Sequence, residues 1–339
     1  MPTILDVAAA AQVSTATVSR VLSNPEKVTE STRSRVLKAV RELGYSPNAA
    51  AKSLRTLSTR KLLVTVPDIA NPFFSLIIQG IEEAALREGY AVVLGDTHHD
   101  PIREEHYGEM LSRREADGLI FLGHSLSKAA RALMQPRRKG RLAPIVNGCE
   151  YSPSLGVPSA HVDNTAAARE AMEHLYGLGH RQIGILTGPL VSPLSRDRLK
   201  GVKDCARNHG QERRLIIVDG DFSIDSGIAG AARLLAQRPV PTAIFCFNDE
   251  MAIGVLDYAQ RLGLRVPESL SIVGFDDIRF SRYMRPALTT ISQPMVDIGR
   301  ETVRLLLGIL QGNITTAVSI TLPHRLEIRA STGPPPRHG

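Results

Sequence analysis

Residues 3–57 read TILDVAAAAQVSTATVSRVLSNPEKVTESTRSRVLKAVRELGYSPNAAAKSLRTL, and this stretch decides how the N-terminal part of the chain folds. Its apolar residues recur about every 3.6 positions in three short runs, which predicts three short amphipathic helices. Thr3 begins an S/T-x-x-D pattern, and Ser14 and Thr29 stand where N-caps of the second and third helices are expected. Gly44 follows the last apolar position, as a glycine at the end of a helix does.

The second predicted helix, from about Thr15 to Ser23, has two faces of different chemistry. Its inward face is aliphatic, whereas its outward face has short side chains, hydroxyls and the guanidinium of Arg20. Short residues let a helix sit deep in a groove of DNA, and an arginine reaches phosphates or guanine edges. Two helices joined by a short turn, with this face on the second, indicate a helix-turn-helix. A three-helix packing unit with no role on DNA has the same periodicity.

The residues themselves favour the first interpretation. LDVAAAAQVSTATVSRVLSN at 5–24 resembles the signature of the LacI family of bacterial transcriptional regulators, and the similarity continues through ELGY at 42–45 and Pro47-Asn48 to about Ser331. This resemblance implies a DNA-binding domain over residues 1–47, with Thr15, Ala16 and Arg20 reading bases. It also implies that Thr17, Ser19 and Asn24 position the DNA backbone, and that the protein is a homodimer on a near-palindromic operator.

Residues 48–60 form a separate feature, an alanine-rich segment of high helix propensity. Leu54 is flanked by Lys52 and Arg55, and an apolar residue between basic ones suits a wedge in the minor groove. In the family this segment is the hinge helix, with Leu54 at the intercalating position and both basic residues against the DNA. A plain linker is the alternative.

Charge and cysteine content restrict the class of protein. Residues 1–60 hold nine Lys or Arg against four acids, whereas the remaining 279 residues hold 32 against 30, so the positive excess lies on the DNA-like segment. The three widely spaced cysteines, Cys149, Cys205 and Cys246, form no C-x-x-C and are expected to be reduced. The chain has no apolar signal region and no run of about 18 apolar residues, which predicts a cytoplasmic protein without a membrane partner.

From Lys61 onward, strand-like and helix-like patterns alternate, which predicts an α/β fold of parallel, doubly wound sheets. The expected strands lie at 62–66, 91–94, 118–122, 144–146, 183–186, 215–218, 243–247 and 270–275. The resemblance implies a periplasmic-binding-protein-like core over 61–332 with two subdomains, one of about 61–162 and 292–319 and the other of about 163–291 and 320–332. Residues 333–339 are expected to form a disordered tail.

Ligands of such sheets bind beyond the carboxyl ends of the strands, so polar and aromatic residues just after each strand are candidates for an effector site. They suit hydroxyl-rich ligands and flat rings. These candidates are Asn71, Phe73, Phe74, Asp96, Ser192, Phe222, Asn248, Asp249 and Asp276, together with Arg198 in a segment that begins a helix. The family resemblance implies that Arg198 and Asp276 bind the effector's hydroxyls and that Phe222 stacks on it. Several of them also have a structural interpretation: core packing for Phe73 or Phe74, helix capping for Asn248 and Asp249, loop bracing for Asp276 and a surface ion pair for Arg198.

The stretches VPDIANPFFSLIIQGIE at 66–82, PTAIFC at 241–246 and LTTISQP at 288–294 are most similar to a nucleoside-responsive branch of the family. The resemblance therefore implies a nucleoside effector, cytidine first. A free sugar or a purine would use much the same residue types and stays open.

Two other classes of protein are disfavoured. The sequence has no G-x-G-x-x-G, G-x-x-x-x-G-K-[ST], G-x-S-x-G or H-E-x-x-H, so neither an enzyme, a cofactor site nor a metal site is expected. A sugar-binding protein without a regulatory role would share the core but not residues 1–57.

Overall fold

The computed structural model describes residues 2–46, 58–134 and 142–336, and the chain forms two compact units that divide between Thr59 and Arg60. Within its described residues, the first unit contains three α-helices and one 3-10 turn: α1 (Ile4–Ala10), α2 (Thr15–Ser23), η1 (Pro25–Lys27) and α3 (Glu30–Leu43). All three predicted helices are present. The expected hinge residues Lys52, Leu54 and Arg55 lie outside the described residues.

Local capping fixes the ends of these helices. Thr3 and Asp6 form a reciprocal capping box, in which Asp6 Oδ2 accepts from the Thr3 amide at 2.7 Å. Ser14 Oγ accepts from the Thr17 amide at 3.2 Å, and Gly44 ends α3 with a φ of 61°. Thr29 occupies the N-cap position of α3 but makes no capping bond there. Its hydroxyl donates to the Thr32 hydroxyl instead, at 3.1 Å.

The second unit begins with a six-stranded sheet in the order β11-β5-β4-β3-β1-β2, in which every pair is parallel. Its strands are β1 (Lys61–Val66), β2 (Ala91–Asp96), β3 (Gly118–Phe121), β4 (Ile145–Gly148), β5 (Ser159–Val162) and β11 (Ser319–Leu322). The helices that cover it in the described part of the chain are α5 (Pro72–Arg87), α6 (Pro101–Ser112), α7 (Lys128–Leu133) and α12 (Met295–Gln311). The loop after β4 contains a short 3-10 turn, η2 (Pro153–Leu155).

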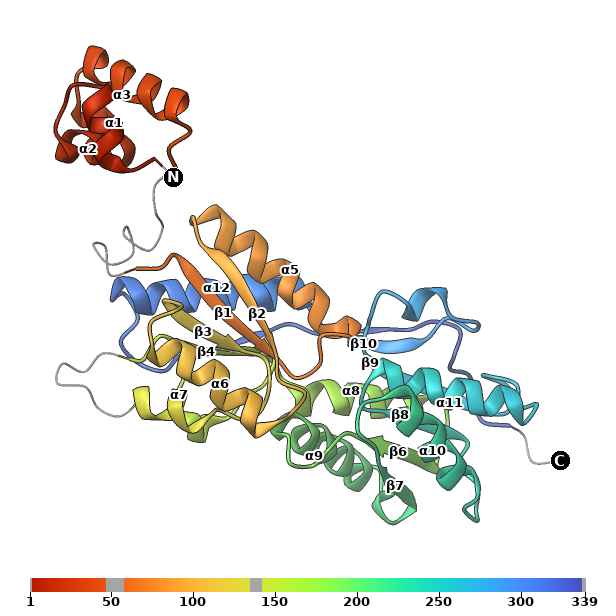
Figure 1. Ribbon diagram of the computed structural model, residues 1–339. Coiled ribbons are helices and arrows are strands. Elements are labelled where there is room, and N and C mark those ends of the chain that lie inside the picture. Colours follow the sequence, from red (N-terminus) through yellow and green to blue (C-terminus); the bar gives the residue numbers. More distant parts are fainter. Residues whose placement is uncertain (1, 47–57, 135–141, 337–339) are drawn as a thin grey trace. The chain divides into compact units, whose positions relative to one another are not determined.

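Alternation along β1 explains why this sheet is covered on both faces. Leu62 and Val64 belong to the cluster with α5 and α12, whereas Leu63 belongs to the cluster with α6 and α7. The helices α5 and α12 lie side by side (Figure 1). The lack of a side chain at Gly80 permits this close approach, because a Cβ there would stand 2.1 Å from the Val296 carbonyl oxygen.

A second six-stranded sheet has the order β12-β10-β9-β8-β6-β7, with only β12 antiparallel to its neighbour. Its strands are β6 (Ile183–Thr187), β7 (Leu215–Asp219), β8 (Ala243–Cys246), β9 (Ser271–Asp276), β10 (Thr289–Ser292) and β12 (Arg325–Glu327). Its helices are α8 (Asn164–Gly177), α9 (Pro193–Asn208), α10 (Ile224–Leu235) and α11 (Asp249–Arg261), with short turns η3 (Glu212–Arg214) and η4 (Ser281–Tyr283).

The two sheets confirm the predicted α/β class, and the chain passes between them three times. Two boundaries differ from the expectation. Residues 320–322 complete β11 of the first sheet, so the last crossing follows Leu322 rather than residue 319. The expected disordered tail is wrong at its start, because Gly333 donates to Ser271 Oγ at 3.0 Å and its carbonyl oxygen lies 2.9 Å from His180 Nε2.

Cys149, Cys205 and Cys246 are free, and all three are buried. In the described part of the chain, no helix combines the length and the apolar character that crossing a membrane requires.

Candidate functional site

A cavity of 1020 Å³ opens where the carboxyl ends of strands from both sheets meet. Pro67 and Asp68 line it just beyond β1, Asp221 beyond β7, and Asp276 at the end of β9. This is the place where parallel α/β sheets bind ligands. The predicted residues that the structure brings to its wall are Asn71, Phe73, Phe74, Ser192, Arg198, Phe222, Asn248 and Asp276.

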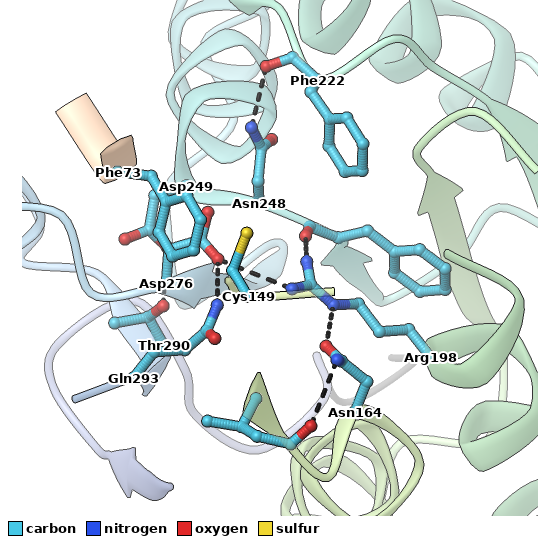
Figure 2. A network of polar contacts seen from close by, with 12 residues as sticks. Phe73, Cys149, Asn164, Arg198, Phe222, Asn248, Asp249, Asp276, Thr290 and Gln293 are labelled. Atoms are coloured by element: carbon cyan, nitrogen blue, oxygen red, sulfur yellow. Dashed lines mark hydrogen bonds and ion pairs between the residues drawn. The ribbon is translucent and has the colours of Figure 1, made fainter. Parts of the chain in front are cut away.

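Arg198 is a buried polar group of this wall that is held by several neighbours (Figure 2). It is 3% exposed, its Nε donates to Asn164 Oδ1 at 2.8 Å, and its Nη1 donates to the Phe247 carbonyl oxygen. Its guanidinium also lies 3.5 Å from the centroid of the Phe275 ring. A long side chain held at three points presents its remaining N–H groups in a fixed direction, which favours recognition of a carboxylate or a pair of hydroxyls.

Asp276 faces Arg198, with Oδ1 at 3.7 Å from Arg198 Nη2 and accepting from Gln293 Nε2 at 2.7 Å. Burial raises the pKa of Asp276 to about 7, although Arg198 and the Gln293 hydrogen bond act in the opposite direction. Desolvation exceeds the attraction because 3.7 Å is too long for a direct bidentate pair. The carboxyl therefore changes charge near neutral pH, where a bound ligand would influence it.

Phe222 owes its place to two neighbours. Its backbone has a φ of 74°, a left-handed conformation that is costly for a residue with a large side chain. Asn248 Nδ2 donates to the Phe222 carbonyl oxygen at 2.8 Å, while Asn248 Oδ1 caps α11 at the Met251 amide. A Cβ at Gly188 would meet the Phe222 ring at 2.0 Å. The Asn248 amide therefore holds the Phe222 backbone, and the lack of a side chain at Gly188 leaves space for the ring on the cavity wall.

A second aromatic group comes from the start of α5. Asn71 Oδ1 accepts from the Phe73 amide at 2.9 Å and begins the helix. The rings of Phe73 and Phe74 meet edge to face with centroids 5.2 Å apart. Phe73 also belongs to the core cluster under α5, so its packing and its position on the cavity wall coexist.

Two of the predicted residues do not line the cavity. Asp249, next to Asn248, turns beneath the wall, where it accepts from Thr290 Oγ1 at 2.6 Å and from the Ile278 amide at 2.8 Å. It is fully buried, and its bond to the Ile278 amide braces the loop after β9. Asp96 Oδ2 lies 2.7 Å from Nε2 of His98, and His98 takes the place on the wall.

Several wall residues were not predicted. Glu150 follows β4 and His124 follows β3, so the rule that selected the other residues would have found both. Burial raises the pKa of Glu150 to about 8 and lowers that of His124. Both groups are therefore biased toward the neutral form.

Among the described residues, Glu173, Cys205 and His209 are the group whose ligand atoms lie close enough to hold a metal ion, all within 4.8 Å of one another. Glu173 already accepts from Cys205 Sγ at 3.2 Å, and its other carboxylate oxygen lies 2.7 Å from His209 Nε2. These bonds satisfy the cluster without an ion.

The first unit presents the face expected to contact DNA. Ala16, Arg20 and Asn24 are exposed, whereas Val18 and Val21 on the opposite side of α2 are buried in the three-helix core. The remaining predicted residues, Thr15, Thr17 and Ser19, are partly exposed.

Comparison with known proteins gives consistent results. Residues 3–48 match the bacterial regulatory proteins of the lacI family, and residues 172–332 match a periplasmic binding protein-like domain. The chain is 43% identical to the HTH-type transcriptional repressor CytR of Escherichia coli (strain K12), over 97% of this chain and 96% of that protein. It is 37% identical to catabolite control protein A of Priestia megaterium, over 97% and 99%.

Solved structures agree. The lac repressor dimer bound to operator and the anti-inducer ONPF has a TM-score of 0.86 at 30% identity, covering 98% of this chain and 99% of that one. A regulator from Enterococcus faecium with bound ribose has a TM-score of 0.71 at 30% identity, covering 81% and 99%. With its helix-turn-helix unit, its two-sheet core and these relatives, the chain belongs to the LacI family of bacterial DNA-binding transcriptional repressors and is not an enzyme.

Proposed function

We propose that this repressor is controlled by a nucleoside, cytidine first, which binds in the cavity between the two sheets. The observation that carries the proposal is the presence, on one cavity wall, of the buried Arg198–Asp276 pair together with the Phe73 and Phe222 rings. A guanidinium and a carboxyl suit the paired hydroxyls of a ribose, and aromatic rings suit the face of a base. The 43% identity to CytR supports the same choice.

A free sugar is the second candidate, since the Enterococcus faecium relative holds ribose and the same hydroxyl-binding groups would serve. The cavity volume of 1020 Å³ favours the larger ligand, because a pentose alone would leave much of it to water. A purine remains the third candidate. A sugar-binding role without regulation is disfavoured by the first unit.

On DNA, we expect the protein to act as a homodimer whose two α2 helices enter successive major grooves about 34 Å apart, so that the operator is near-palindromic. Thr15, Ala16 and Arg20 would read bases, and Leu54 of each hinge would enter the minor groove at the centre. Effector binding would change the closure of the two subdomains and release the operator. A ligand shifts this equilibrium only by its differential affinity for the two states.

The proposal is tested by titrating the purified protein calorimetrically with cytidine, adenosine, ribose and hypoxanthine. Tight binding of cytidine, and its release of the operator, supports the nucleoside. Preference for ribose or hypoxanthine would replace it, and no binding by any of the four would refute it.

Two variants locate the site. Arg198→Ala and Asp276→Ala should abolish the effector response and leave operator binding intact, since neither residue belongs to the DNA-binding unit. Arg213→Ala, at an exposed position of η3, is the matched control and should respond like the wild type. A normal response in both cavity variants would remove this cavity from the proposal.

A further inference from the structure

Glu150 lies on the cavity wall, and only one of its two carboxyl oxygens has a hydrogen-bond partner among the described residues. It stands two residues beyond β4 and is 5% exposed. Its Oε1 accepts from Ser192 Oγ at 3.2 Å, whereas its buried Oε2 has no hydrogen-bond partner among the described residues. Buried polar atoms in native proteins nearly always have a partner, so an orphan oxygen on a ligand cavity points to the ligand.

The charge state of this carboxyl decides what partner it needs. Burial raises its pKa to about 8, against the Ser192 hydrogen bond and the guanidinium groups of Arg198 and Arg196, and Asp197 adds to the rise. At neutral pH the group is therefore mostly protonated. Because Oε1 accepts from Ser192, the proton belongs on Oε2, which makes the orphan atom an O–H donor without an acceptor.

A neutral carboxyl presents one donor and one acceptor side by side in a plane. The complementary ligand has an acceptor atom next to an N–H group in a flat ring, and this is the pattern along the hydrogen-bonding edge of a nucleobase. A sugar hydroxyl offers no such planar pair. We propose that Glu150 recognises the base of a nucleoside effector, with Oε2–H donating to a ring acceptor and Oε1 accepting from the neighbouring amino group.

The position of Glu150 suits an arrangement in which the sugar and the base of the ligand contact different residues of the cavity. Figure 2 places Cys149, the preceding residue, beside Arg198 and Asp276. Glu150 comes from the first-sheet side and Ser192 from the start of α9, so their bond spans the two subdomains. A ribose on Arg198 and Asp276 would leave its base within reach of Glu150. The inference rests on the proposed function, because it requires a base in the cavity.

The test changes one protein group, the Glu150 side chain, and one ligand atom, the ring acceptor of the base, separately and together. The affinity of the full chain for each ligand is measured by calorimetry. The ligands are cytidine, 3-deazacytidine (in which a C–H replaces the ring acceptor N3) and ribose. The proteins are the wild type, Glu150→Gln, which keeps a donor and an acceptor, and Glu150→Ala, which keeps neither. Glu212→Ala, at an exposed position of η3, is the control.

We expect Glu150→Gln to bind cytidine within about threefold of the wild type and Glu150→Ala to bind it at least about tenfold more weakly, as the loss of two buried hydrogen bonds implies. The wild type should bind 3-deazacytidine about tenfold more weakly than cytidine, and Glu150→Ala should bind both alike. Ribose affinity should be the same in all four proteins.

Three results would overturn the inference. Equal losses for cytidine and ribose in Glu150→Ala would make the carboxyl a structural group. A Glu150→Gln variant as weak as Glu150→Ala would mean an ionised carboxylate that needs two donors. Undiminished discrimination against 3-deazacytidine in Glu150→Ala would place N3 elsewhere. Failure of cytidine to bind the wild type at all is a different outcome, because it rejects the nucleoside effector itself.

Discussion

Replacing Asp276 by asparagine should make the stability of the core less dependent on pH. The side chain is 5% exposed, and burial raises its pKa to about 7 despite Arg198 at 3.7 Å. In the unfolded chain the carboxyl has its ordinary pKa of 3.8 and is ionised above pH 5. Between the pKa of 3.8 in the unfolded chain and the pKa of about 7 in the folded protein, Asp276 is protonated only in the folded protein. The free energy of unfolding therefore falls as the pH rises toward 7, and this contribution is constant above pH 7.

The size of the effect follows from the pKa. Between pH 5 and pH 8 the folded state gives up its proton at about pH 7, two pH units above the start, and each unit corresponds to about 1.4 kcal/mol. The free energy of unfolding of the wild type should therefore fall by about 3 kcal/mol relative to that of Asp276→Asn. The raised carboxyls Glu150 and Glu250 titrate in both proteins and cancel in the difference to first order.

The assay is urea unfolding of both full-length proteins at pH 5, 6, 7 and 8, followed by circular dichroism. Asp225→Asn is the matched control, since Asp225 lies on the same cavity at an exposed position. Its curve should run parallel to that of the wild type. If the Asp276→Asn curve also runs parallel, the carboxyl is ionised already at pH 5, and attraction to Arg198 exceeds the cost of burial.

Three further predictions concern the aromatic wall and the DNA. Gly188→Ala should weaken effector binding at least about tenfold, because the added Cβ would displace the Phe222 ring. Gly177→Ala, which has open space around it, is the control and should bind the effector like the wild type. If Gly188→Ala also binds the effector like the wild type, the ring has no role. Leu54→Ala should weaken binding to the operator much more than to unrelated DNA, and equal losses in a gel-shift assay would reject the wedge. Operator affinity should fall steeply with salt because several phosphates are contacted, so a flat dependence would contradict the basic face.

The core was largely predictable because most of its strands are apolar runs, but four strands, β5, β10, β11 and β12, were not predicted. β5 is Ser-Ala-His-Val and β10 is Thr-Thr-Ile-Ser, and both lie buried inside their sheets. Their polar side chains are acceptable there only through particular partners. His161 Nε2, for example, lies 2.8 Å from Ser319 Oγ, a residue 158 positions away. No local pattern reveals such a partner.

The candidate site shows the same limit at the level of single residues. The rule of looking beyond strand ends selected Phe222 and Asp276, since it depends only on topology. Arg198 lies within α9 rather than just beyond a strand, and it was selected from the family resemblance. The rule treated Asn248 and Asp249 alike, although one lines the cavity and the other lies beneath it. At the first turn of α11 a rotation of one position moves a side chain from the cavity to the core. The sequence does not specify that rotation.

The contacts around the cavity suggest how a ligand would act at a distance. Asp276 is bonded to Gln293, which stands on the second passage of the chain between the sheets. Ile278, two residues after Asp276, packs in the apolar cluster of the first sheet rather than in that of the second. A ligand that changes the hydrogen bonds or the charge of Asp276 therefore acts on the segments that join the subdomains. We expect ligand binding to be coupled to subdomain closure because Asp276 contacts both the ligand and these segments. The same residues would then set the difference in ligand affinity between the open and the closed arrangement.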